Sequence, residues 1–457
     1  MFTFPVAHFG GGVGFTIDQA LRFNDDDSAS LNRTPGSAGN RRTWTFSCWV
    51  KRGNLTGANQ PIFSAGGDHW LMFLSAETLG FNTSGSNYRI VTSQVFRDPG
   101  AWFHLVLRVD TTASAGDRLR LYINGSEVTS FGTDTNPTLN LDTAFNNTGE
   151  HRIGKLVGAS QYFDGYLAEI HHVDGTSLGP DVWGEQSSDG VWIPKKPSGI
   201  SYGTTGFHVD GSNSSDLGED QVGSNDWTSN NLAAADSVSD SPTVNWCVWN
   251  PIDTSFNNNV TSDGNLKITT ASPGYTRFQL GTFGVTSGKW EWKWTPTASL
   301  SDGGIGVDDG TSQAATGASS GAFSSQSANG FIYRSNGQKL VGGSVSSYGA
   351  TFAADDVIRC QIDLDADTPT IEFFKNDASQ GSINMNAGVT YFPCQFSADA
   401  GLVTVADFGQ SGFTAAAGFN TLNTASLPTP SIKDGSAYFQ PTLYTGTGSS
   451  RSVDQSG

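Results

Sequence analysis

A chain of 457 residues is long enough for two or three domains, each able to bury its own core. Only 15% of its residues are charged, against roughly 25% in ordinary globular proteins, and its 56 glycines are typical of short strands joined by tight turns. The formal net charge of −18 repels phosphate groups, so we expect neither nucleic acid nor an anionic membrane surface as a partner.

We expect neither a secretory signal nor a disulfide framework. The first twenty-one residues contain no Lys or Arg and no continuous apolar core, and no run of the sequence reaches the roughly 18 apolar residues of a membrane span. Cys48 precedes the other three cysteines by about two hundred residues, which argues against a disulfide framework. Cys48 and Cys360 lie in apolar strand patterns, so we expect both to be small buried side chains.

Residues 1–20 form an N-terminal arm rich in glycine and phenylalanine. Phe2, Phe4, Phe9 and Phe15 alternate with a cluster of glycines in a segment too short to fold as a domain. Exposed phenylalanine is costly unless a partner covers it. The arm is therefore either a fraying tail or a docking segment.

Strand patterns begin at Leu21 and continue over residues 21–198. Thr43–Lys51 alternates, with Trp44, Phe46, Cys48 and Val50 on one face. Trp102–Asp110 is apolar on both faces, as expected of a central strand. Asn124-Gly125 predicts a type I′ hairpin turn between Arg118–Asn124 and a returning strand at Glu127–Phe131. We expect Tyr162–Val173 to close the domain.

Five segments of this region, in this order and spacing, resemble the laminin-G-like family of concanavalin A-like lectins and glucanases. They are Leu21–Asp25, Trp44–Lys51, Trp102–Leu105, Leu121–Gly125 and Phe163–Glu169. The resemblance implies a jelly-roll β-sandwich. Residues 199–245 are rich in Asn, Asp and Ser and resemble the connector that follows such a domain in phage proteins, with Gly206–Asp210 able to add one strand.

A second strand pattern covers residues 246–412. Lys289–Thr295 places Trp290, Trp292 and Trp294 on one face, and Val357–Leu364 alternates in the same way. With Thr370–Lys375 and Val403–Phe408, the order resembles a SPRY domain, which is another concanavalin-like sandwich. The predicted fold class is therefore all-β, with two concanavalin-like jelly-roll β-sandwiches in series.

Residues 413–457 are predicted to be a linker followed by the start of a further β segment. Asn420–Pro430 has the composition of a linker, and Ala437–Gly446 alternates and carries aromatic residues. A single strand without a partner is unstable, so this segment packs back on the second sandwich, pairs with another subunit, or opens a domain that continues beyond Gly457.

The sequence assigns no catalytic, cofactor-binding or metal-binding residue. Gly317–Gly321 matches G-x-S-x-G but lacks the strand-to-helix context of a nucleophile elbow. Asp363, Asp365 and Asp367 fail the EF-hand pattern and are expected to form a polar turn. Asn24–Asp27 is expected to be a solvated loop, although sandwiches of the resembled family sometimes bind calcium at such edges.

The sequence shows neither a histidine pair that could bind a metal nor a carboxylate pair that could cleave a glycosidic bond. His171 and His172 are strand neighbours that point to opposite faces and cannot chelate one metal, and neither has a second ligand at suitable spacing. A retaining glycosidase needs two carboxyl groups about 5 Å apart, but Glu169 shares its face with His171 and Val173 rather than with a carboxylate. We therefore expect no enzymatic activity.

The order of the two domains and the connector resembles phage tail-fibre and related virion appendage proteins. This resemblance implies a virion protein, synthesised in the host cytoplasm, that attaches to a host glycan or protein and contacts other virion proteins. We expect a homo-oligomer, with a trimer favoured. A cellular carbohydrate- or protein-binding module and a glycan-degrading tail enzyme remain as alternatives. The ligand-binding residues are not identified; Trp70, Tyr88 and Tyr333 are candidates as loop aromatics.

Overall fold

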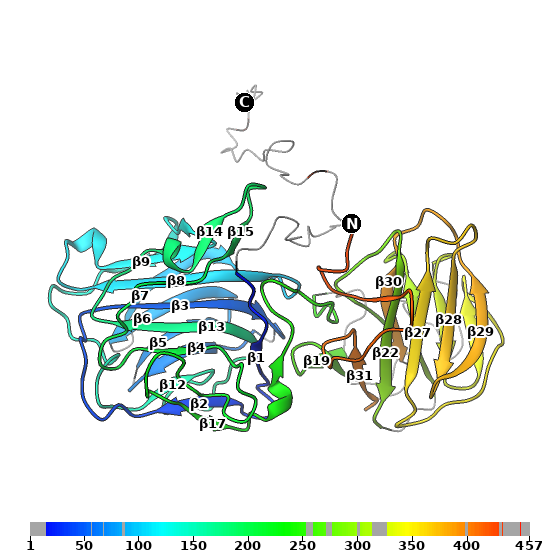
Figure 1. Cartoon of the computed structure of the whole chain (residues 1–457), viewed down its shortest axis with the longest axis horizontal. Coiled ribbons are helices and arrows are strands. Elements are labelled where there is room, and N and C mark those ends of the chain that lie inside the picture. Colours follow the sequence, from blue (N-terminus) through cyan, green and yellow to red (C-terminus); the bar gives the residue numbers. More distant parts are fainter. Residues whose placement is uncertain are drawn as a thin grey trace.

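The computed structural model contains two β-sandwiches side by side (Figure 1). It describes residues 15–55, 57–66, 68–84, 87–252, 259–270, 277–298, 302–312, 327–397 and 401–428, together with Ile432 and Gly448. In these residues the helical elements are three short 3₁₀ turns, η1 (Ala115–Asp117), η2 (Pro180–Val182) and η3 (Ala234–Asp236). The expected all-β fold class is confirmed.

Two eight-stranded sheets form the first sandwich. The β3 sheet contains, in order, β10 (Ser126–Glu127), β9 (Leu119–Ile123), β8 (Trp102–Asp110), β3 (Thr43–Arg52), β13 (Gly165–Asp174), β1 (Ala20–Phe23) and β18 (Ser237–Val238), and β16 (Phe207–Val209) also pairs with β13. The β5 sheet contains, in order, β11 (Phe131–Asp134), β7 (Asn87–Val95), β6 (Thr78–Ser84), β5 (His69–Phe73), β4 (Gln60–Ala65), β12 (His151–Ile153), β2 (Ser30–Arg33) and β17 (Thr228–Asn230).

The two sheets enclose one apolar core. Trp44, Phe46, Cys48 and Val50 all face it, which confirms the alternation predicted for β3. Asn124 and Gly125 have φ values of 47° and 76°, so the predicted hairpin turn is present. The predicted return strand was wrong in extent, because β10 ends at Glu127 and Phe131 begins β11 in the opposite sheet.

The predicted connector over residues 199–245 was wrong as a linker, because it completes the first sandwich. Its strands β16, β17 and β18 pair with β13, β2 and β1 respectively. Phe207, Leu217 and Trp227 contribute to the first core. The polar composition reflects turns between short edge strands, whose unpaired backbone groups these pairings satisfy. A small hairpin, β14 (Gly184–Gln186) and β15 (Trp192–Pro194), is also attached to this sandwich (Figure 1).

The second sandwich also consists of two sheets. The β22 sheet contains, in order, β19 (Asn259–Ser262), β20 (Lys267–Thr270), β31 (Val403–Asp407), β22 (Lys289–Pro296), β27 (Ile358–Asp363), β28 (Thr370–Lys375) and β29 (Ala378–Asn384), and β32 (Asn420–Thr421) pairs in parallel with β22. The β23 sheet contains, in order, β21 (Arg277–Leu280), β30 (Phe392–Ser397), β23 (Gly303–Asp308), β24 (Phe331–Arg334), β25 (Gln338–Val341) and β26 (Ser344–Ser347).

Tryptophans dominate the second core. Trp290, Trp292 and Trp294 are each at most 1% exposed, as their shared strand face predicts. The linker predicted at Asn420–Pro430 was wrong for its first part, because β32 pairs with β22 and Leu422 is buried in this core. Gly317–Gly321 and Ala437–Gly446 lie outside the described residues. All four cysteines are free and buried, as expected of Cys48 and Cys360.

A buried ion pair lies where the two sandwiches meet. Lys51 Nζ on β3 is 2.7 Å from Asp240 Oδ2, and it also donates to Asn245 Oδ1 at 2.8 Å and to the Trp246 carbonyl oxygen at 3.0 Å. Both charged side chains are fully buried. Tyr166 donates a hydrogen bond to the Gly264 carbonyl oxygen at 2.8 Å. The first sheet of one domain therefore contacts the opening segment of the next directly.

Candidate functional site

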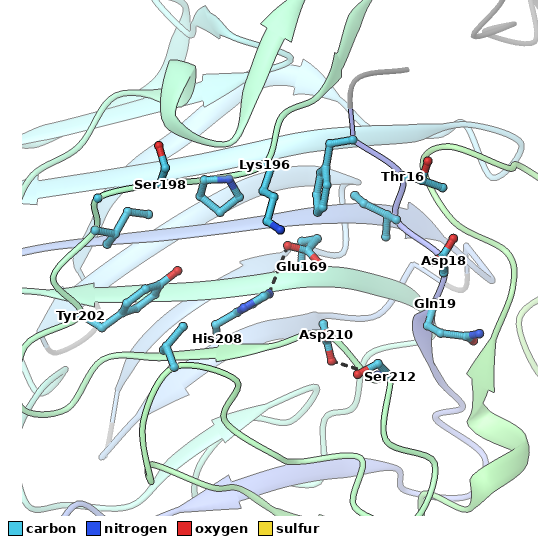
Figure 2. Close-up of a pocket in the computed structure, with 16 residues that line it drawn as sticks. Thr16, Asp18, Gln19, Glu169, Lys196, Ser198, Tyr202, His208, Asp210 and Ser212 are labelled. Carbon is cyan, nitrogen blue, oxygen red and sulfur yellow. Dashed lines mark hydrogen bonds and ion pairs between the residues drawn. The ribbon is translucent and has the colours of Figure 1, made fainter. Parts of the chain in front are cut away.

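A cavity of about 460 Å³ lies on the outer face of the β3 sheet. Its walls come from the segment that enters β1 (residues 15–19) and from the segment that follows β15 (residues 196–202). β13 contributes Glu169, and β16 with its following turn contributes His208, Asp210 and Ser212 (Figure 2). We call this the outer-face cavity.

A β-bulge in β13 presents Glu169 to this cavity. The pairing with β3 changes register between Ala168 and His171, and Glu169 has a φ of 48°, an uncommon left-handed value for a non-glycine residue. As a result Leu167 and Ile170 both face the core, although they are three residues apart. The extra residue places Glu169 on the outer face together with His171.

Glu169 contacts two histidines through one oxygen. Its Oε2 atom lies 3.1 Å from His171 Nε2 and 3.1 Å from His208 Nε2. His171 and His208 are directly opposite each other in the β13–β16 pairing, and their rings stack with centroids 4.0 Å apart. On its far side, His171 Nδ1 lies 2.9 Å from the Tyr202 hydroxyl. Figure 2 shows Glu169 and His208 in contact beneath Lys196.

Burial and the carboxylate set the protonation of this cluster. Burial lowers the pKa of His171 to about 4, with a further contribution from His208, so its imidazole is neutral near pH 7. Burial tends to raise the pKa of Glu169, but contacts with both histidines outweigh it and hold this pKa below its usual value. The Glu169 carboxylate is therefore charged near pH 7.

His171 and His172 point to opposite faces, as their positions on one strand predict. His172 lies on the core side, where its Nε2 is 2.6 Å from Asn146 Oδ1 and its ring stacks on Phe207. Sequence spacing offers His171 no second histidine, but the fold brings His208 on β16 directly opposite it. The sequence predicted a strand at Gly206–Asp210, which includes His208. It did not predict that this strand pairs with β13.

Two of the three candidate loop aromatics are buried on strands. Trp70 is on β5 and only 4% exposed, and Tyr333 is on β24 and fully buried. Both were therefore wrong as loop residues. The side chain of Tyr88 lies outside the described residues. The aromatic residues that line the outer-face cavity are instead Phe15 and Tyr202.

The two acidic segments differ in their surroundings. Asp363 caps the turn after β27 by accepting the backbone N–H groups of Asp365 and Ala366, which confirms the predicted polar turn. In the Asn24–Asp27 loop, Asp25 approaches the fully buried Asp164. Burial, with the charge of Asp25 next, raises the pKa of Asp164 well above its usual value.

No helix among the described residues is long and apolar enough to cross a membrane. A comparison with curated protein sequences finds no match. Residues 23–180 match the family model of the concanavalin A-like lectin/glucanases superfamily, which is about a third of the chain.

Many solved structures also match. The SPRY domain of human HERC1 is 20% identical, with a TM-score of 0.27, and the match covers 34% of this chain and 94% of that one. A second human SPRY domain is 13% identical, with a TM-score of 0.26, over 35% and 99%. A candidate carbohydrate-binding protein from Bacteroides ovatus is 16% identical, with a TM-score of 0.36, over 47% and 59%. The family-model match over residues 23–180 indicates a concanavalin A-like fold for the first sandwich, which is similar to the lectins and glucanases of that superfamily.

Proposed function

We propose that this protein is a non-catalytic attachment protein that binds a glycan in the outer-face cavity. The observation that carries the proposal is a cavity lined by both polar and apolar side chains, on a sandwich similar to lectins. Its lining includes a cation, carboxylates, hydroxyl groups and the aromatic rings of Phe15 and Tyr202. Hydroxyl groups of sugars bind to such polar side chains, while the faces of sugar rings pack on aromatic ones.

The finer part of the proposal is a place on the surface of a phage particle. The order of the domains, the high glycine content and the low fraction of charged residues support this location. There the protein contacts other virion proteins and binds a host glycan or protein, without nucleic acid or membrane. Gold-labelled antibody against the chain, viewed on intact particles by electron microscopy, tests this location. Light scattering on the full chain tests the expected homo-oligomer, for which we favour a trimer.

Glycan binding is tested with the full chain on an array of bacterial surface polysaccharides. Lys196 lines the cavity and is exposed, so its ammonium is available to a ligand oxygen. We expect Lys196→Ala to weaken binding about tenfold or more, because a hydrogen bond to a charged group contributes roughly 1.5–3 kcal/mol. The neighbouring Lys195, exposed but outside the cavity, provides the matched control Lys195→Ala.

Equal binding by Lys196→Ala and the wild type would argue against the cavity as the glycan site. Release of reducing ends from a bound polysaccharide would instead support the glycan-degrading alternative. Binding to a protein receptor with no glycan hit would favour the protein-binding alternative.

A further inference from the structure

We propose that Glu169, His171 and His208 bind one divalent transition-metal ion of the zinc class, with a coordination position left open toward the outer-face cavity. These side chains offer one carboxylate oxygen and two imidazole nitrogens, all within 4.8 Å of one another. The assignment does not depend on glycan binding, and its test contains no glycan.

The distances already approach those of a metal site. Both histidine Nε2 atoms lie 3.1 Å from Glu169 Oε2. A tetrahedral zinc ion with bonds near 2.0–2.1 Å holds its ligand atoms about 3.3 Å apart. To bind one ion, the two stacked imidazole rings must rotate until their Nε2 atoms point to a common centre. The ring of His208 has room to rotate because it lies at the cavity wall and is 15% exposed.

One buried nitrogen of His208 is poorly satisfied by the protein itself. Its Nε2 atom lies 3.1 Å from Glu169 Oε2, but the two groups are not aligned as a good hydrogen bond. A buried polar atom without a hydrogen bond is costly, and a metal ion would remove this cost. The atom is directed at the same carboxylate oxygen that His171 contacts.

The surroundings of His171 are those of a metal ligand. The Tyr202 hydroxyl lies 2.9 Å from Nδ1 of this histidine, where it fixes the ring orientation and leaves Nε2 for the ion. The backbone contributes as well, since His171 and His208 are direct cross-strand partners, and such partners have side chains about 5 Å apart.

The donor set selects the kind of ion. Two nitrogens and one carboxylate oxygen suit zinc, cobalt, nickel and copper, whereas calcium and magnesium prefer all-oxygen sites. Three protein ligands leave a fourth tetrahedral position, which in this fold faces the cavity that Glu169 and His208 line. A water molecule or a ligand oxygen would occupy it.

The test is titration of the full, metal-free chain with Zn²⁺ by calorimetry and with Co²⁺ by visible spectroscopy. We expect one ion per chain and the intense visible absorption of tetrahedral cobalt. His208→Gln should weaken zinc binding by about 100-fold or more, since it removes a direct ligand, and Tyr202→Phe by about 10- to 100-fold through the orientation of His171.

His69→Gln is the matched control, because His69 lies on β5 in the opposite sheet. Circular dichroism of each variant shows whether it is folded, and Tyr202→Phe keeps all three ligands if a ligand variant fails to fold. The proposal is overturned if the folded wild type takes up far less than one ion per chain. It is equally overturned if His208→Gln and Tyr202→Phe both bind zinc as the wild type does.

Discussion

Single residues in this protein have partners that strand periodicity cannot reveal. Alternation along Thr43–Arg52 correctly separates the core face from the outer face. It gives no sign that Lys51 on the outer face is fully buried, because the covering residues are Asp240 and Asn245, almost two hundred positions later. In the same way, His208 was not predicted as a partner of Glu169, since their contact depends on the pairing of β16 with β13.

Lys51 provides a prediction at this scale. Lys51→Met would leave the Asp240 carboxylate buried without its cation, and we expect a loss of about 3–5 kcal/mol in the free energy of unfolding. Denaturant unfolding of the full chain measures it. The double variant Lys51→Met/Asp240→Asn removes both charges and should recover much of the loss. Additive losses in this double-mutant cycle would contradict a coupled pair.

Elements were predicted well where they are long and poorly where they are short. β8 and β28 have the predicted bounds, and β22 and β27 differ from their predictions by one residue at one or both ends. The strands β16, β17 and β18 have two or three residues each and lie in polar sequence, so no apolar period marks them. The bulge at Glu169 is likewise unmarked, because an extra residue leaves the composition of a strand unchanged.

The hairpin turn after β9 supplies a prediction for an element. Gly125 has a φ of 76°, and a Cβ atom there would lie 2.4 Å from the ring of Trp192 on β15. Gly125→Ala should therefore strain the turn and displace β15, and we expect a loss of about 1–3 kcal/mol in the free energy of unfolding. Gly116→Ala is the control, since a Cβ atom at Gly116 meets nothing within 4 Å. Equal stability of the two variants would show that β15 tolerates displacement.

At the scale of the whole molecule, two β-sandwiches in series were predictable from turn residues and alternating strands. The boundary between the sandwiches was not predictable, because the polar segment between them completes the first sandwich. The histidines are also unevenly shared. His208 is the last histidine in the sequence, so the second sandwich has none. This asymmetry predicts that acid affects the two sandwiches differently.

Two histidines of the first sandwich, His104 and His151, are buried. Burial is the main reason that the pKa of His104 falls to about 3 and that of His151 to about 4. The unfolded chain, with histidine pKa values near 6.5, binds protons that the folded chain does not. Their contribution to stability is therefore complete above about pH 6.5 and is lost as the pH falls toward about 4. At pH 5 each should cost about 2 kcal/mol relative to neutral pH.

Hydrogen exchange read by mass spectrometry, corrected for intrinsic rates, can follow both sandwiches in the same chain at pH 7 and pH 5. We expect protection of β8 to fall on acidification while that of β27 stays nearly constant. Asp164 and Asp240, whose pKa values burial raises, take up protons in the folded chain as the pH falls and so oppose part of this loss. His151→Gln cannot gain the proton and should reduce the loss in β8. An equal fall in both strands, or none in β8, would contradict the prediction.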